Sequence, residues 1–209
     1  MPTSSRRTRN RKGPPPKPEG RYHHGDLRTA LMEAGREMLA EVGPAELSLR
    51  ELARRLGVSH NAPYKHFATR EALLAALAAQ GFEALAQRTR AVAEPGAGLD
   101  AMGLAYIGFA LDQPAIYRVM FSDAVDKSAF PDLQKASLGS FDVLRRAIAA
   151  AYGPERADAA ATSAWALVHG LALLLLDKQL PSSLSAGRSP IEAACAVLQA
   201  FAKGAGKQR

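Results

Sequence analysis

The sequence has few of the residues and patterns that define several large classes of protein. A single cysteine, Cys195, among 209 residues excludes a disulfide framework and a cysteine-ligated zinc site, and it fits a reducing compartment. Aromatic residues make up only 6% of the chain, and no run of alternating β-branched residues indicates strands. The charged N-terminus continues into a Pro-rich run over residues 13–18, which is not the pattern of a signal peptide.

The longest apolar run is also shorter than a membrane-spanning segment. It covers residues 165–176, whereas a transmembrane helix needs about 20 apolar residues. Asp158 lies shortly before this run and His169 lies within it. We therefore expect a buried helix in a cytoplasmic protein that does not interact with a membrane.

Alanine is abundant, with 42 positions, and hydrophobic residues make up 47% of the chain. Because alanine has the highest helix propensity, this composition predicts an all-α protein with a substantial core. Glycine-proline pairs at residues 43–44 and 153–154, and the segment 94–98, divide the chain into elements. We expect helices over about residues 26–42, 49–56, 59–66, 70–93, 99–111, 114–121, 131–152, 154–179 and 190–203.

Charge is concentrated at one end of the chain. The net charge is +7, and residues 1–21 hold seven basic side chains against one acidic side chain. Residues 22–70 hold seven basic against six acidic side chains, and residues 71–209 hold thirteen of each. The Arg-, Pro- and Gly-rich residues 1–21 are predicted to form a disordered arm. Such an arm can enter a DNA minor groove, can add only non-specific, salt-sensitive binding, or can serve solely as a solubilising tail.

Two short predicted helices joined by a turn at Gly57 match the helix-turn-helix pattern. Ser48 and Glu51 form a capping box at the start of the first helix. In this motif the first helix crosses the DNA backbone and the second lies in the major groove. Val58 and Phe67 are the expected buried anchors, so the polar residues between them are expected to face DNA.

Each polar residue of the predicted recognition helix has an expected role. Asn61 can read an adenine edge, and His60 or Lys65 can read guanine acceptors. Tyr64 and His66 are expected to bind phosphates, which position the helix without reading sequence. Ser48 and Ser59 cap helices whose N-termini can also face phosphates. The complete set of candidate DNA-binding residues is Ser48, Ser59, His60, Asn61, Tyr64, Lys65, His66 and Arg70. The alternative is an ordinary solvated helix face.

The segment over residues 47–74, LSLRELARRLGVSHNAPYKHFATREALL, resembles the DNA-binding domain of the tetracycline repressor (TetR) family. The resemblance rests on Gly57-Val58-Ser59, on Tyr64-Lys65-His66-Phe67 at the end of the recognition helix, and on Arg70-Glu71-Ala72-Leu73. One departure is Ala62-Pro63, where many members carry a small hydroxyl residue followed by Leu. We therefore assign no phosphate contact to Ala62.

The C-terminal part is similar to one branch of the same family, which is named for its Trp, His and Gly. The similar strings are residues 109–121 and residues 165–171, and the second contains Trp165, His169 and Gly170. The resemblance implies a helix-turn-helix domain over residues 22–70, a helical ligand-binding and dimerisation domain over residues 71–203, and a tail over 204–209. It also implies a homodimer in which the last two helices of each chain form a four-helix interface.

An apolar ligand cavity and an ordinary core are both compatible with the aromatic residues of the C-terminal part. If a cavity exists, its expected lining is Tyr106, Phe109, Tyr117, Met120, Phe121, Phe141, Trp165 and His169.

Other classes of function are less favoured. No nucleophile motif or paired acid accompanies His169, so we expect neither an enzyme nor a catalytic residue. His23 and His24 lack metal-ligand spacing to Cys or acidic residues, so we expect no metal site and no cofactor. A non-specific DNA-packaging protein is the remaining rival. The sequence thus favours a transcriptional repressor that binds double-stranded operator DNA with palindromic sequence and is released by a small, apolar effector.

Overall fold

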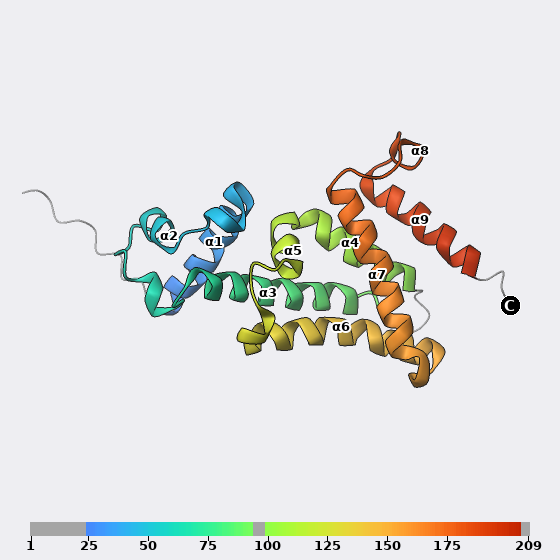
Figure 1. The fold of residues 1–209 in the computed structure, drawn as a ribbon, viewed down its shortest axis with the longest axis horizontal. Helices are drawn as coiled ribbons and strands as arrows, with labels where there is room; N and C mark the ends of the chain where they lie inside the picture. The colour runs from blue at the N-terminus through green and yellow to red at the C-terminus, as the bar shows by residue number, and fades with distance from the viewer. Residues whose placement is uncertain (1–23, 94–98, 206–209) are drawn as a thin grey trace, which may run out of the picture.

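The computed structural model describes residues 24–93 and 99–205, and these ranges contain helices and no strand (Figure 1). The predictions for residues 1–21, for His23 and for residues 206–209 lie outside these ranges. At one end of the molecule lie α1 (His24–Glu46), α2 (Leu49–Arg55) and a 3₁₀ turn, η1 (Pro63–Lys65). The long helix α3 (Arg70–Arg90) runs from this end into the rest of the protein.

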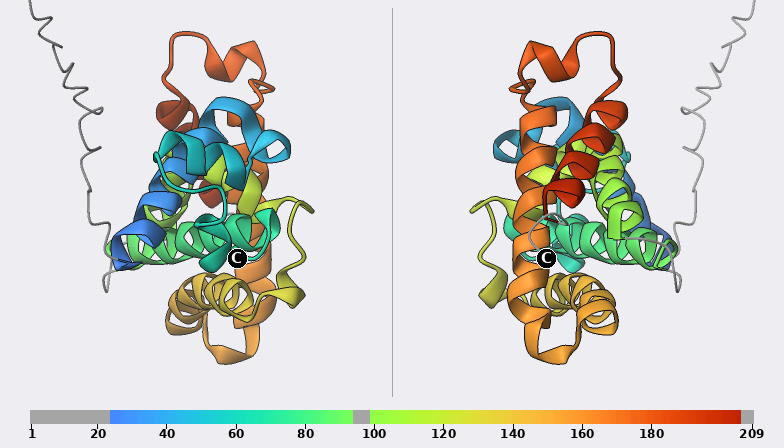
Figure 2. Two further views of the ribbon diagram at one scale, coloured as in Figure 1. Left: turned by 90° about the vertical axis from the view of Figure 1, so that its left-hand side faces the viewer. Right: turned by 90° about the vertical axis from the view of Figure 1, so that its right-hand side faces the viewer.

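The remaining helices form a body around α3. In chain order they are α4 (Leu99–Asp112), α5 (Pro114–Phe121), η2 (Lys127–Ala129), α6 (Pro131–Tyr152), η3 (Pro154–Arg156), α7 (Ala157–Leu176), α8 (Ser182–Ser185) and α9 (Pro190–Ala205). Helices α4, α5 and α6 pack on α3, while α7 packs on α4 and α6, and α9 packs on α4. Figure 2 (right) shows α7 and α9 on the outer face of this body, away from α1 and α2.

Glycine and proline set most of the observed boundaries, as the sequence predicts. The backbone of α1 departs from helical geometry at Gly43, immediately before Pro44, and α6 ends at Gly153. The predicted helix over 154–179 is divided into η3 and α7, and the predicted loop after it contains the one-turn helix α8. Helix α9 includes residues 204 and 205, which the sequence assigned to the tail.

The predicted recognition helix over residues 59–66 is wrong in detail. Residues 60–62 form turns, and only Pro63–Lys65 are helical, in the 3₁₀ form. Proline has no N–H to donate to the carbonyl of Ser59, so the first helical turn lacks a hydrogen bond. The bonds from Ala62 N to the Ser59 carbonyl and from His66 N to the Pro63 carbonyl span three residues. Pro63 therefore has a larger effect on this segment than the helix-turn-helix pattern predicts.

A single hydrophobic core connects the two ends of the molecule. It runs from Leu31 and Leu52 through Leu77 on α3 to Tyr117 on α5, all of which are almost completely buried. Helices α3 and α5 approach so closely at Gly81 that an added Cβ atom would lie 2.6 Å from the Ile116 and Met120 side chains. The predicted domain boundary at residue 70 falls at the start of α3, which belongs to this shared core.

The helix that the sequence predicts to be buried is only partly buried within the single chain. By length and composition alone, the helical segment Pro154–Leu176 would be able to cross a membrane, and only 22% of its most apolar window is buried. Leu174 on α7 is 44% exposed, and Phe201 on α9 is 59% exposed. On α9, Ala194 and Leu198 are buried, whereas Ile191 at the start of the helix is exposed.

Candidate DNA interface and ligand cavity

Helix α2 begins with the cap that the sequence predicts. The Ser48 hydroxyl accepts a hydrogen bond from the backbone N–H of Glu51 at 3.4 Å. The Glu51 carboxylate bonds Arg54 and Arg55, with Arg54 donating at 2.7 and 2.8 Å, instead of returning to the cap. The Arg54 hydrogen bonds are the main reason why the pKa of Glu51 falls to about 2. Arg54 and Arg55 are therefore already paired with acidic residues of the protein.

The turn after α2 presents the predicted recognition residues to solvent. Gly57 has a φ of +67°, a left-handed conformation that glycine adopts without strain, and it redirects the chain after α2. Ser59, His60, Asn61 and Lys65 are exposed, and Tyr64 is 42% exposed. These side chains come from the turns and from η1, so the predicted DNA-reading set lies on one short exposed segment.

Phe67 and the side chains around it anchor this segment to the core. Phe67 is 3% exposed, and the guanidinium of Arg28 on α1 lies 4.6 Å from its ring centroid. Val58, the other predicted anchor, is only half-buried. The Nε2 atom of His66 is buried and has no hydrogen-bond partner among the described residues. The Nε2 atom of His66 is thus directed away from solvent, whereas the side chains of Tyr64 and Lys65 are exposed.

Arg70 is held by the protein backbone rather than left free in solvent. Its guanidinium donates to the carbonyl oxygens of Pro44 and Ala45, at 3.3 and 2.8 Å, and to the carboxylate of Glu71. These bonds join the start of α3 to the end of α1. Arg50 is a further exposed basic residue, in the first turn of α2, and it forms no ion pair within the described ranges. The motif pattern alone did not single out Arg50.

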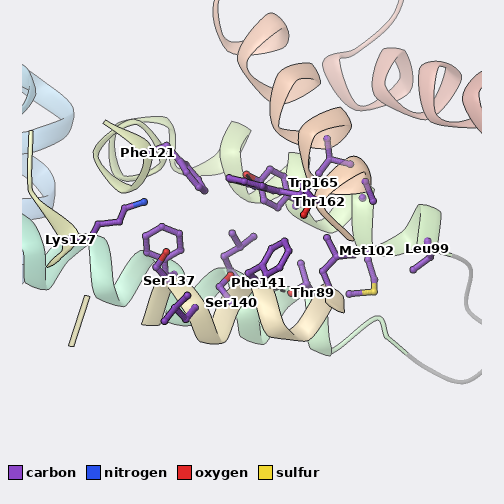
Figure 3. A pocket seen from close by; sticks show the side chains of 18 residues that line it. Thr89, Leu99, Met102, Phe121, Lys127, Ser137, Ser140, Phe141, Thr162 and Trp165 are labelled. Carbon is purple, nitrogen blue, oxygen red and sulfur yellow. Dashed lines mark hydrogen bonds between the residues drawn. The ribbon is translucent and has the colours of Figure 1, made fainter. Parts of the chain in front are cut away.

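A cavity of about 310 Å³ lies in the helical body, between α3, α4, α6 and α7 (Figure 3). Its walls are mostly apolar and aromatic, which is typical of small-molecule sites. The residues that line it are Phe82, Leu85, Thr89, Leu99, Met102, Gly103, Tyr106, Phe121, Lys127, Ser137, Leu138, Ser140, Phe141, Leu144, Thr162, Ala164, Trp165 and Val168. Ser137, Phe141 and Leu144, which follow one another at helical spacing on α6, thus face the cavity.

The structure divides the predicted ligand-binding residues into two groups. Tyr106, Phe121, Phe141 and Trp165 line the cavity. Phe109, Tyr117 and Met120 are buried in the core and do not line it, and His169 lies behind the wall that Tyr106 and Trp165 form. Aromatic residues serve both core and cavity here, so residue type did not distinguish the two groups.

Hydrogen bonds connect the cavity wall to α5. The indole N–H of Trp165 donates to the hydroxyl of Tyr106 at 3.3 Å, and this hydroxyl lies 3.1 Å from that of Tyr117. The Nδ1 atom of His169 lies 2.7 Å from the Tyr117 hydroxyl and 2.9 Å from the Tyr106 hydroxyl. Because indole only donates, the chain of bonds can run from Trp165 through both tyrosines to His169.

Burial favours the uncharged forms of the two tyrosines and of His169 in this chain. Desolvation raises the pKa of Tyr106 to about 12, and it also raises the pKa of Tyr117. Burial and the nearby charge of Lys127 lower the pKa of His169 from its usual value. A neutral His169 can accept a tyrosine proton at Nδ1.

The other end of α5 contacts α1. Gln113, which precedes the first residue of α5, accepts a hydrogen bond from Arg36 of α1 at 3.1 Å. Arg36 also donates to Gln80 of α3 at 3.0 Å. A short helix thus carries cavity residue Phe121 at one end and contacts α1 at the other. Among the described residues, no group of three or more His, Cys, Asp or Glu side chains could hold a metal ion.

Fold and site together define a helix-turn-helix protein whose helical body encloses an apolar cavity. Comparison with family models agrees with this class. Residues 31–77 match the model of bacterial regulatory proteins of the tetR family, and residues 99–203 match the tetracyclin repressor-like C-terminal domain. The second match alone covers half of the chain. The chain belongs to the TetR family, whose members are transcriptional regulators and not enzymes.

Curated relatives and solved structures extend this comparison. An HTH-type transcriptional repressor of Mycobacterium tuberculosis is 35% identical over 52 residues, and the match spans 28% of that repressor and 25% of this chain. The structure of a protein with unknown function from Rhodococcus sp. RHA1 is 35% identical, with a TM-score of 0.75, covering 89% of this chain and 98% of that chain.

A structure with a bound ligand also has this fold. A TetR variant from Acinetobacter baumannii AYE in complex with minocycline is 26% identical, with a TM-score of 0.52, covering 84% of this chain and 90% of that chain.

Proposed function

We propose that this protein is a transcriptional repressor that binds a palindromic operator as a homodimer and leaves the DNA when a small apolar effector fills its cavity. The observation that carries this proposal is the combination of an exposed helix-turn-helix with an apolar cavity on one continuous core. Within the family, the relative from Mycobacterium tuberculosis is described as a repressor, and the variant from Acinetobacter baumannii holds minocycline.

DNA reading is assigned to the exposed segment after α2. Asn61, His60 and Lys65 contact base edges, while Tyr64 and Arg50 bind phosphates. Ser48 caps α2 and helps to orient its backbone N–H groups toward phosphates. The cap predicted at Ser59 is absent, because Ala62 precedes η1 and no side chain caps it. Arg70 supports the interface by holding α1 to α3, since its donors are directed at the Pro44 and Ala45 carbonyls.

The dimer is assigned to the exposed apolar faces of α7 and α9. These faces carry Leu174, Ile191 and Phe201, which are between 40% and 59% exposed. A second copy that covers them through a two-fold axis would place two recognition segments about one DNA turn apart, roughly 34 Å. This arrangement explains the apolar exposure of α7 without requiring a membrane.

Release from DNA is assigned to α5. A ligand between Phe121 and Trp165, whose ring centroids are 6.2 Å apart, would move α5 through these side chains and through Tyr117. Arg36 and the close approach at Gly81 would carry this displacement to α1 and α3. A ligand that binds better to the displaced state shifts the population away from the spacing that fits DNA.

The function is tested by selection of bound duplexes from a random DNA library, followed by gel-shift measurements. We expect an enriched palindrome that binds at least about 10³-fold more tightly than a scrambled duplex. Absence of enrichment would favour the non-specific DNA-packaging protein and contradict the proposal.

Asn61→Ala tests the assigned recognition segment. We expect discrimination at one base pair per half-site to fall by about 1–3 kcal/mol, because a bidentate amide contact is removed. Gln134→Ala removes an exposed amide on α6 and should leave the selected sequence unchanged. If Asn61→Ala selects the same sequence with the same stringency as the unmodified chain, this residue does not read a base.

A further inference from the structure

Lys127 is the one charged side chain among the described residues that line the cavity. It belongs to η2, between α5 and α6, and its ammonium group lies 5.0 Å from the ring centroid of Phe82 and 5.4 Å from that of Phe121. Figure 3 shows Lys127 at one end of the cavity, and Leu99 and Met102 at the opposite end. The cavity therefore has a cationic end and an apolar end.

No carboxylate of the described ranges pairs with this ammonium group. Asp126, its neighbour in the chain, instead accepts hydrogen bonds from the backbone N–H and hydroxyl of Ser128, at 2.9 and 2.7 Å. The rings of Phe82 and Phe121 attract the ammonium group through their π faces, but they do not neutralise its positive charge. Burial lowers the pKa of Lys127, which reflects an ammonium group that lacks an anionic partner.

Most other polar groups of the cavity are already satisfied by the protein. The Thr89 hydroxyl donates to the Leu85 carbonyl at 2.9 Å, and the Thr162 hydroxyl donates to the Asp158 carbonyl at 2.8 Å. The Trp165 N–H is used by Tyr106. The hydroxyls of Ser137 and Ser140 form no hydrogen bond with any described residue, and Ser137 lies toward the same end as Lys127. The groups left for a ligand are thus a cation with one hydroxyl near it, and a second serine hydroxyl farther along the wall.

We propose that the cavity binds a monocarboxylate with an apolar body, whose carboxylate pairs with Lys127 and accepts from Ser137 while the body extends toward Met102 and Leu99. A single lysine with one nearby hydroxyl suits one negative charge, whereas phosphate sites generally combine several basic side chains or backbone N–H groups. This inference rests on the proposed function, since it names the chemical class of the effector.

Calorimetric titration of the purified full chain with decanoate, decan-1-ol and decylamine tests the inference. These probes share one apolar body and differ in their head group. We expect decanoate to bind at least about tenfold more tightly than decan-1-ol, because decanoate adds a charge-assisted hydrogen bond to the half-buried ammonium group of Lys127. Decylamine should bind more weakly than decan-1-ol, because its charge repels Lys127.

Two variants and one control connect the preference to Lys127. Lys127→Met should abolish the preference for decanoate while decan-1-ol binding stays within about threefold, which also shows that the variant is folded. Lys127→Arg should retain the preference. Lys135→Met removes an exposed lysine of α6 that does not line this cavity, and it should behave like the unmodified chain.

Several results would overturn the inference. One is that decan-1-ol or decylamine binds as tightly as decanoate or more tightly. The others are that Lys127→Met keeps the full preference for decanoate, or that none of the three probes binds. These titrations contain no DNA, so their failure is distinct from failure of operator selection. If decan-1-ol binds best and releases the operator, the apolar-effector function stands and only the anionic class is excluded.

Discussion

His169 is a histidine that the protein keeps neutral. Its Nδ1 atom contacts two tyrosine hydroxyls, and burial together with Lys127 lowers its pKa. The folded protein therefore binds a proton at His169 more weakly than the unfolded chain does. The contribution to stability is fully present above the ordinary pKa of 6.5, and it is lost as the pH falls through the lowered value of the folded state.

We expect urea unfolding to show this pH dependence. The free energy of unfolding should be lower at about pH 5.5 than at about pH 7.5, and His169→Gln should reduce the difference. Carboxylates with a lowered pKa, such as Glu51, lose their contribution to stability only below about pH 4.5. They therefore do not account for a difference in stability between about pH 5.5 and about pH 7.5. A difference that is the same in both proteins would show that His169 is not its source.

Arg50 and Arg54 are basic residues one helical turn apart on α2, and their environments differ. Arg54 is paired with Glu51 at 2.7 Å, whereas Arg50 has no ion pair within the described part of the chain. We expect Arg50→Ala to lower the slope of log affinity against log salt by about 0.9, because one phosphate contact is lost. Arg54→Ala should change the slope less. Equal slopes for both variants would contradict the assignment of Arg50.

At the scale of the element, the approach of α3 and α5 depends on one glycine. We expect Gly81→Ala to destabilise the protein by about 1–3 kcal/mol, because the new methyl group would lie 2.6 Å from buried Ile116 and Met120. Gly139→Ala is the matched control on α6, where an added Cβ atom meets nothing within 4 Å.

Denaturant titration compares the two variants. Gly139→Ala should stabilise the helix by about 0.5–1 kcal/mol through its higher propensity. Equal stability of Gly81→Ala and the unmodified chain would mean that α5 shifts to accept the methyl group. In that case α5 could not transmit a displacement to α3 in the proposed way.

The elements themselves were largely predictable, because their boundaries depend on local chemistry. Ser48, Gly57 and Gly153 mark helix ends through capping and left-handed backbone, and both effects are visible in a sequence. The recognition segment was less predictable, since Pro63 competes with a strong helix-turn-helix pattern. Which effect prevails depends on the packing of buried Pro63 and Phe67, which is tertiary information.

The cavity was only partly predictable for a related reason. Tyr106, Phe121, Phe141 and Trp165 were expected on its wall, but Phe109, Tyr117 and Met120 have the same chemistry and fill the core. Periodicity places side chains on a face of a helix, and it does not say whether that face meets a neighbour or a gap. Lys127 lies in a short 3₁₀ turn without any periodic signal, so nothing in the sequence indicated its role.

At the scale of the whole molecule, the exposed apolar faces of α7 and α9 form the proposed dimer interface. We expect sedimentation velocity at micromolar concentration to show a dimer, and Leu174→Glu or Phe201→Glu to produce a monomer. Each substitution would place a charge in an apolar interface, which is strongly unfavourable without a partner. Both variants should also lose tight binding to the palindrome, because one half-site alone remains available.

Tyr152→Glu is the control for the assembly, because Tyr152 is 54% exposed at the end of α6, outside this face. It should remain dimeric. A monomeric unmodified chain, or dissociation caused equally by Tyr152→Glu, would contradict the proposed interface.

Trp165 is the single tryptophan of the chain, and it lies on the cavity wall between Phe121 and Phe141. When the indole is excited, the tryptophan fluorescence of the protein therefore comes from Trp165 on the cavity wall alone. Its emission reports the polarity of the cavity and the state of the N–H bond to Tyr106. The protein thus contains its own optical reporter of cavity occupancy, which allows compound libraries to be screened without a label and without knowledge of the operator.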